Sequence, residues 1–115
     1  MTVQMFDAPP VTLAEAIAAY RQARYTFACV PGTGAQLARA EAQLRAAGFD
    51  RVSGLVTLPV SAVHFSDVRA DGARMSAVCG GSHSAEVWVS WSGRSLPCGV
   101  ESRTYGPWDL VQVKA

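Results

Sequence analysis

A cysteine and a histidine stand close together in the sequence, at Cys79 and His83, with two glycines and a serine between them. A thiol becomes a nucleophile when an imidazole can take its proton, and Asp67 or His64 could complete such a triad. The spacing is a weak signal, because residues on opposite sides of a two-glycine turn need not face each other. Cys79 also continues an apolar run over residues 75–78, where buried structural cysteines are common. We therefore expect an inert core thiol, with a cysteine-dependent hydrolase or transferase that uses Cys79, His83 and Asp67 as the alternative.

The same residue types could be combined as a zinc site from Cys79, His83, Cys98 and His64. Structural zinc sites usually draw their ligands from close pairs such as Cys-x-x-Cys, which this sequence lacks. We expect no bound metal and no other cofactor. The cysteines are odd in number and widely spaced, so we expect thiols rather than a structural disulfide.

A turn around Thr33 is a second chemical candidate, because its flanking glycines, Gly32 and Gly34, precede a helical pattern and could present amides to an anion. A phosphate loop of the Walker type needs a lysine after the glycines, and no lysine occurs before Lys114. Helix capping explains Thr33 and both glycines. We therefore expect capping here rather than a ligand.

The carboxylates offer no pair of general acid and base that spacing alone can propose. Asp67 and Asp71 flank a turn, whereas the remaining candidates in the second half stand alone, at Glu86, Glu101 and Asp109. We expect these side chains to be solvated.

Alternation along residues 85–91 separates two faces of a predicted strand. One face carries Trp88 between Glu86 and Ser90, and the other carries apolar residues, namely Val87, Val89 and Trp91. The apolar face is expected to be core. The Trp88 face is either open to a partner or covered by a helix, and the sequence favours neither.

The residues best suited to contact a partner are Trp88, Arg94, Arg103 and Tyr105, because protein interfaces are enriched in tryptophan, tyrosine and arginine. We expect them to form one binding surface.

These candidates must be positioned by helices and strands, and the first half of the chain predicts two helices. The first begins at Thr12, which forms a capping box with Glu15. The second covers residues 34–47 and ends at Gly48. The apolar run that begins at Tyr25 is predicted to be a strand, so that residues 25–58 form a β-α-β unit with one parallel pair.

The second half is predicted to be an antiparallel meander, with strands over residues 51–58, 60–69, 73–78, 85–91 and 108–113. Asp71 and Gly72 suit a tight hairpin turn between two of them. Residues 100–105 are either a short strand or loop, and residues 3–6 could form an edge strand. The sequence therefore predicts a single α+β domain over residues 1–115, with two N-terminal helices packed on a mainly antiparallel sheet.

Composition limits the classes of ligand. Ten basic residues against nine acidic ones leave a net charge of +1, so nucleic acid is not expected as the main ligand.

No apolar run approaches the roughly 20 residues of a membrane span, and residues 1–10 lack the pattern of a secretory signal, so we expect no membrane partner and a cytoplasmic location. Nearly all basic residues are arginine, which is typical of a GC-rich bacterium or its phages.

The sequence thus favours a small non-enzymatic protein-binding protein of bacterial or phage origin. An inhibitor that blocks a surface of a larger host complex, such as a defence nuclease, would suit its size and near-neutral charge. The alternatives are a structural or accessory subunit of an assembly and the Cys79 enzyme. The oligomeric state is left open.

Overall fold

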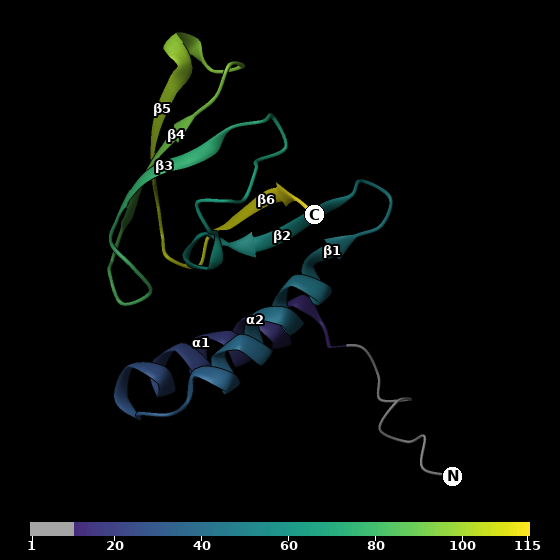
Figure 1. Cartoon of the computed structure of the whole chain (residues 1–115), viewed down its shortest axis with the longest axis vertical. Coiled ribbons are helices and arrows are strands. Elements are labelled where there is room, and N and C mark those ends of the chain that lie inside the picture. The colour runs from purple at the N-terminus through teal and green to yellow at the C-terminus, as the bar shows by residue number, and fades with distance from the viewer. Residues whose placement is uncertain (1–10) are drawn as a thin grey trace. The chain divides into compact units, whose positions relative to one another are not determined.

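The computed structural model describes residues 11–115 and has an α+β fold, as the sequence predicts. The chain divides into two compact units, Met1–Ala47 and Gly48–Ala115 (Figure 1). The predicted edge strand over residues 3–6 lies outside the described residues. Within the described part of the chain, neither helix is long and apolar enough to cross a membrane.

The first unit is a helical hairpin made of α1 (Leu13–Cys29) and α2 (Gly34–Gly48). Gly48, the last residue of α2, is the first residue of the second unit. The predicted capping box is present at the start of α1. The Thr12 hydroxyl accepts from the Glu15 amide at 3.1 Å, and the Glu15 carboxylate accepts from the Thr12 amide at 3.1 Å. α2 begins at Gly34, so both helices begin where the sequence predicts.

The predicted strand at Tyr25 is wrong, because α1 continues through it to Cys29. The physical reason is that no glycine or proline separates Tyr25 from the helical pattern before it. The side chains that precede it also favour the helix, since Arg24 donates to the Tyr20 hydroxyl at 3.3 Å across one helical turn. The β-α-β unit with its parallel pair is therefore absent from the described residues, where every pairing between named strands is antiparallel.

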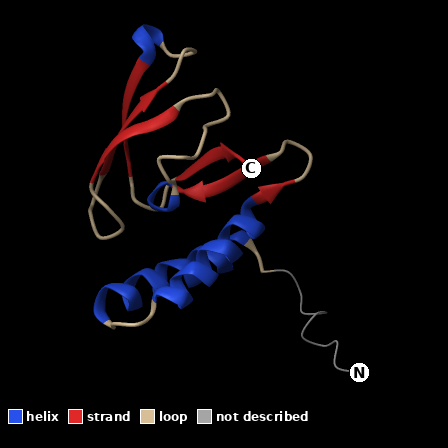
Figure 2. Ribbon diagram, in the orientation of Figure 1, coloured by secondary structure: helices blue, strands red, loops and turns tan. Residues whose placement is uncertain are grey.

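The second unit contains two antiparallel sheets of three strands each (Figure 2). One sheet has the order β1-β2-β6 and the other has the order β3-β4-β5. The strands are β1 (Phe49–Asp50), β2 (Leu55–Pro59), β3 (Arg74–Cys79), β4 (Val87–Ser92), β5 (Val100–Tyr105) and β6 (Leu110–Lys114). The segment left open between strand and loop, residues 100–105, is thus a strand.

The segment over residues 60–69 is not the strand that its apolar pattern predicts. It begins with a 3-10 turn, η2 (Val60–Ala62), and keeps only isolated bridges at its end. The predicted hairpin turn is confirmed, because the Gly72 amide donates to the Arg69 carbonyl at 2.8 Å and Gly72 has a φ of 91°. This turn holds Arg69 and Asp71 on a short loop in front of β3.

Backbone hydrogen bonds join the two sheets of the second unit. The Lys114 amide donates to the Val68 carbonyl at 2.7 Å, and Arg69 forms an antiparallel bridge with Val113. The most deeply buried side chains of this unit come from both sheets, and include Leu58, Val87, Val89, Trp91 and Val113. The loop that carries Arg69 is therefore bonded to β6 through Val68 and Arg69 and to β3 through Val68.

Candidate functional site

The middle strand β4 has one buried face and one more exposed face, which confirms the alternation predicted for it. Val87, Val89 and Trp91 are buried. Trp88, on the opposite face, is 58% exposed. The register places Cys79 and Thr104 on either side of Trp88, so these three residues form a row across the sheet.

A second row lies beside the first and consists of small side chains. Ala77 and Ser102 flank Ser90 in the strand register. We call the six residues of these two rows the outer face: Ala77, Cys79, Trp88, Ser90, Ser102 and Thr104. None of these six residues is a Lys, Arg, Asp or Glu. Trp88 is therefore a single large aromatic side chain among small neutral neighbours.

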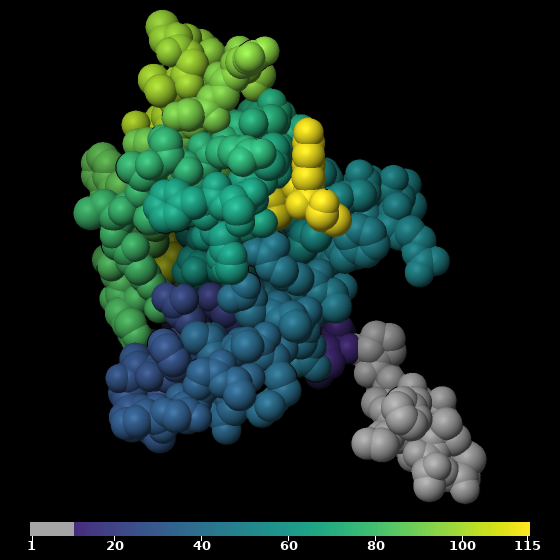
Figure 3. Space-filling view, in the orientation of Figure 1, coloured from purple at the N-terminus to yellow at the C-terminus, as the bar shows by residue number. Residues whose placement is uncertain are grey.

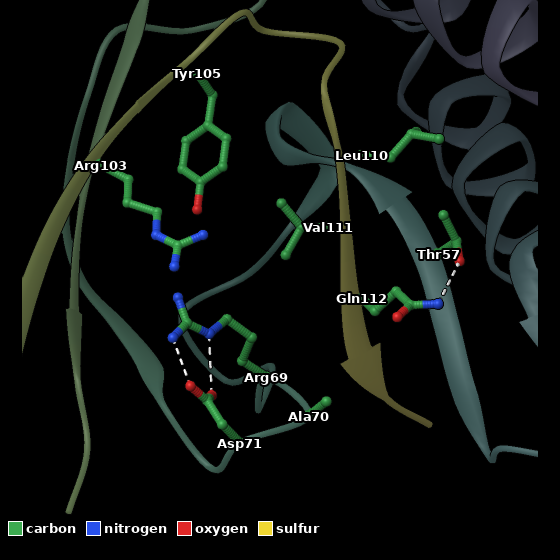
Figure 4. A pocket seen from close by; sticks show the side chains of 9 residues that line it. All are labelled: Thr57, Arg69, Ala70, Asp71, Arg103, Tyr105, Leu110, Val111 and Gln112. Atoms are coloured by element: carbon green, nitrogen blue, oxygen red, sulfur yellow. Dashed lines mark hydrogen bonds and ion pairs between the residues drawn. The ribbon is translucent and has the colours of Figure 1, made fainter. Parts of the chain in front are cut away.

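The inner side of the same sheet opens into a pocket of about 600 Å³, which we call the arginine pocket (Figure 4). It is lined by side chains from β2, β5, β6 and the loop before β3. These residues are Thr57, Arg69, Ala70, Asp71, Arg103, Tyr105, Leu110, Val111 and Gln112. All of them lie within the second unit. Figure 4 shows the guanidinium groups of Arg69 and Arg103 pointing toward each other across this space.

Arg69 is held in place from three sides. Its Nε and Nη2 donate to the Asp71 carboxylate at 3.0 and 2.5 Å, and its Nη1 donates to Glu101 Oε2 at 2.9 Å. Its guanidinium lies 4.8 Å from the centre of the buried Trp91 ring, within the range of a cation–π interaction. Because its side chain is only 12% exposed, Arg69 is a fixed wall of the arginine pocket.

Glu101 joins the two arginines. Its carboxylate accepts from Arg69 and also pairs with Arg103, whose Nε lies 2.7 Å from Glu101 Oε2. Hydrogen bonds from Arg69 lower the pKa of the Asp71 carboxyl to about 2 and also lower the pKa of Glu101, where Arg103 adds to the effect. Both carboxylates are therefore ionised at neutral pH.

This cluster corrects the expectation that Asp71 and Glu101 are simply solvated. Sequence spacing did not reveal it, because Arg69 and Glu101 are 32 positions apart. One signal was present: if residues 100–105 are a strand, period two places Glu101, Arg103 and Tyr105 on the same face.

The predicted binding residues do not form one surface. Arg103 and Tyr105 line the arginine pocket, whereas Trp88 lies on the opposite face of the sheet. Arg94 is exposed in the loop between β4 and β5, which is light green at the top of Figure 3. The structure thus offers two separate candidate sites, the outer face and the arginine pocket.

The predicted thiol chemistry gains no geometric support. Cys79 is exposed at the end of β3, so the expectation of a buried core thiol is wrong, because the outer face on which it lies is open. Asp67 Oδ2 accepts from the backbone amide of His64 at 2.7 Å and so caps its own turn. His83 lies in the exposed turn that follows β3. A triad of Cys79, His83 and Asp67 therefore stays an untested prediction.

The three cysteines, Cys29, Cys79 and Cys98, are all exposed thiols. Among residues 11–115, no group of three or more His, Cys, Asp or Glu side chains is arranged to hold a metal ion. Comparison with known proteins adds no assignment, because no family model, no curated protein and no solved structure matches this chain.

Proposed function

We propose that this chain is a non-enzymatic protein-binding protein that docks on a larger protein through its outer face. The observation that carries the proposal is the exposure of Trp88, 58% of whose surface is open to solvent at the middle strand of a sheet. Tryptophan is among the residues that contribute most to protein binding when they enter a pocket of a partner.

The neighbours of Trp88 favour close contact with a partner. Serine, alanine and threonine have short side chains, so little side-chain entropy is lost when a partner covers them. Ser76 already donates its hydroxyl hydrogen to the Ser90 carbonyl at 3.1 Å, which fixes one side chain beside the outer face. A partner can therefore approach the sheet closely around a single protruding indole ring.

The charge distribution indicates the chemistry of the partner surface. The outer face is neutral, Arg74 lies opposite Ser92 at the end of the sheet far from Trp88, and Glu86 directly precedes β4 at the other end. A neutral centre with charges at its rim is the usual anatomy of a protein interface. The partner surface is therefore apolar and uncharged, with a pocket that admits an indole ring.

By covering such a surface on a larger host complex, for instance a defence nuclease, the chain would act as an inhibitor. We infer this role and a bacterial or phage origin from the composition and size of the chain. The three exposed thiols support a cytoplasmic location, because a reducing compartment keeps such thiols from forming disulfides.

The test is site-specific photo-crosslinking in the natural host. A photoreactive phenylalanine analogue replaces Thr104, which lies beside Trp88 on the outer face, in one variant and Phe65 in a matched control, since Phe65 is 56% exposed elsewhere in the same unit. The expected result, with Trp88 retained, is one dominant crosslinked protein at position 104 and none at position 65. Crosslinks to a second copy of this chain, or equal yields at both positions, would overturn the proposal, and the former would favour a structural subunit.

Affinity then gives the quantitative check. With the crosslinked partner purified, Trp88→Ala should weaken binding at least about tenfold, or about 1.4 kcal/mol, in calorimetric titration. Phe65→Ala should leave the dissociation constant unchanged. Equal affinities for the wild-type protein and Trp88→Ala would show that the outer face is not the interface.

A further inference from the structure

We propose that the arginine pocket binds the carboxylate of a ligand with an apolar body, supplied either by the C-terminus of a peptide or by a free carboxylic acid. This site lies on the opposite side of the β3-β4-β5 sheet from Trp88, so the proposal is independent of the function proposed above.

Arg69 supplies the first preorganised donors. A guanidinium carries five N–H hydrogens, and the bonds from Arg69 to Asp71 and Glu101 engage only some of them. Its nitrogens are already oriented by these carboxylates and by the Trp91 ring. A bound carboxylate would therefore meet donors that need no rearrangement, which lowers the entropy cost of binding.

Arg103 approaches the same space from β5. Glu101 engages its Nε and one Nη2 hydrogen, with Nη2 3.3 Å from Glu101 Oε1, so the remaining N–H groups are available on a side chain that is 55% exposed. Glu101 Oε2 already bridges the two guanidinium groups, so a ligand carboxylate would accept from the Arg103 Nη hydrogens that Glu101 leaves unused.

Tyr105 adds a donor of a different kind. Its hydroxyl oxygen accepts from the Trp91 indole nitrogen at 3.0 Å, which leaves the hydroxyl hydrogen to be donated elsewhere. The hydroxyl points into the arginine pocket beside the Arg103 guanidinium, and an arginine cannot accept that hydrogen. An acceptor-rich ligand in the pocket can.

The walls of the arginine pocket favour an anion with an apolar body. The carboxylates of Asp71 and Glu101 balance the two guanidinium groups, so the attraction for an anion comes from unused N–H and O–H donors and not from an excess of positive charge. Leu110 and Val111 of β6 also line the pocket, and in Figure 4 Val111 lies on the side of β6 that faces the arginines, whereas Leu110 lies on the other side. A volume of about 600 Å³ is within the range of small-ligand sites. The combination suits one carboxylate attached to a branched aliphatic group.

The experiment is a titration of the isotope-labelled full chain with small ligands, in which NMR chemical shifts are measured at each step. The probes are N-acetyl-leucine, N-acetyl-leucinamide, 4-methylpentanoate and inorganic phosphate. We expect N-acetyl-leucine to shift the Trp91 indole signal and the Arg103 and Gln112 amides with millimolar affinity, and N-acetyl-leucinamide to shift none of them at about 20 mM. Equal shifts with the amide, or none with the acid, would overturn the proposal.

The other probes identify the source of the carboxylate. If 4-methylpentanoate binds as tightly as N-acetyl-leucine, the pocket recognises a free acid. If it binds at least about tenfold more weakly, the amide group contributes and the ligand is a peptide C-terminus. Either result supports a carboxylate site. Equal or tighter binding of phosphate would contradict the requirement for an apolar body.

A matched pair of variants locates the site. Arg103→Gln should weaken binding of N-acetyl-leucine at least about tenfold, whereas Arg94→Gln, with the same change of charge on an exposed loop, should leave it unchanged. Equal losses in both variants would show a non-specific charge effect and overturn the assignment. If Arg103→Gln fails to fold, the comparison of N-acetyl-leucine with N-acetyl-leucinamide on the wild-type chain still tests whether the pocket binds a carboxylate.

Discussion

The indole nitrogen of Trp91 donates a hydrogen bond to the hydroxyl oxygen of Tyr105 at 3.0 Å. Trp91 is fully buried in the core, whereas Tyr105 reaches into the arginine pocket, so this bond joins the core of the second unit to its candidate ligand site. The two residues come from adjacent strands, β4 and β5, and both lie on the inner side of the sheet.

Replacing Tyr105 by Phe should destabilise the fold by about 1–3 kcal/mol, because the buried indole N–H of Trp91 would lose its acceptor. Thr104→Val, next to it on the opposite face, should change stability by less than about 0.5 kcal/mol. Urea unfolding followed by tryptophan fluorescence measures both values. Equal small effects would mean that the Trp91–Tyr105 bond contributes nothing to stability.

Stability should fall when the pH drops through the range in which Asp71 titrates. Its pKa is about 2 in the folded state against 3.8 for an unperturbed aspartate side chain, so its contribution to stability is fully present above about pH 4 and is lost progressively toward pH 2. Glu101, whose pKa is also lowered, acts in the same direction. Urea midpoints measured between pH 6 and pH 2 should show this loss.

Asp71→Asn tests the assignment. It should lower stability at neutral pH and flatten the fall on acidification, because the variant has no carboxylate to protonate beside Arg69. Glu86→Gln, which removes an exposed carboxylate elsewhere, serves as the control. An unchanged acid slope in Asp71→Asn would assign the pH dependence to other groups.

The first residues of both helices and the faces of β4 could be predicted from the sequence because they depend on local signals. The Thr12 and Glu15 pair marks a helix start by itself, and alternation over residues 85–91 separates Trp88 from the core. The strand predicted at Tyr25 failed because β-branched and aromatic residues only favour strands where a sheet exists to receive them. Without a breaker before Pro31, the helix continued.

The arginine pocket could not be predicted because its residues meet only after both sheets form. The hairpin turn at Asp71 and Gly72 was recognisable, but the bonds that place Arg69 beside Glu101 depend on pairing across sheets, such as the bridge from Arg69 to Val113. Spacing in the sequence carries no information on such contacts. Residue type did identify Arg103 and Tyr105, without revealing that they share a pocket.

A bulky adduct on Cys79 should block the proposed partner, because Cys79 lies directly opposite Trp88 on the outer face. With Cys29 and Cys98 replaced by Ser, alkylation of the remaining Cys79 with a fluorescent maleimide should weaken partner binding at least about tenfold. An adduct on Cys98 alone, in η3 (Pro97–Gly99), should have no effect. Equal inhibition by both adducts would place the interface elsewhere.

The junction at the end of α2 should tolerate no side chain. A Cβ atom on Gly48 would lie 2.1 Å from the Thr57 carbonyl oxygen, and that oxygen belongs to the backbone of β2 and cannot move aside cheaply. Gly48→Ala should therefore lower the free energy of unfolding by about 3 kcal/mol or more.

Gly54→Ala is the matched control. Gly54 has nothing within 4 Å of the added atom and a φ of 72°, so only backbone strain of about 1–2 kcal/mol is expected. Urea unfolding of both variants gives the comparison. If Gly48→Ala is the milder change, the close approach of residue 48 to β2 does not occur in solution.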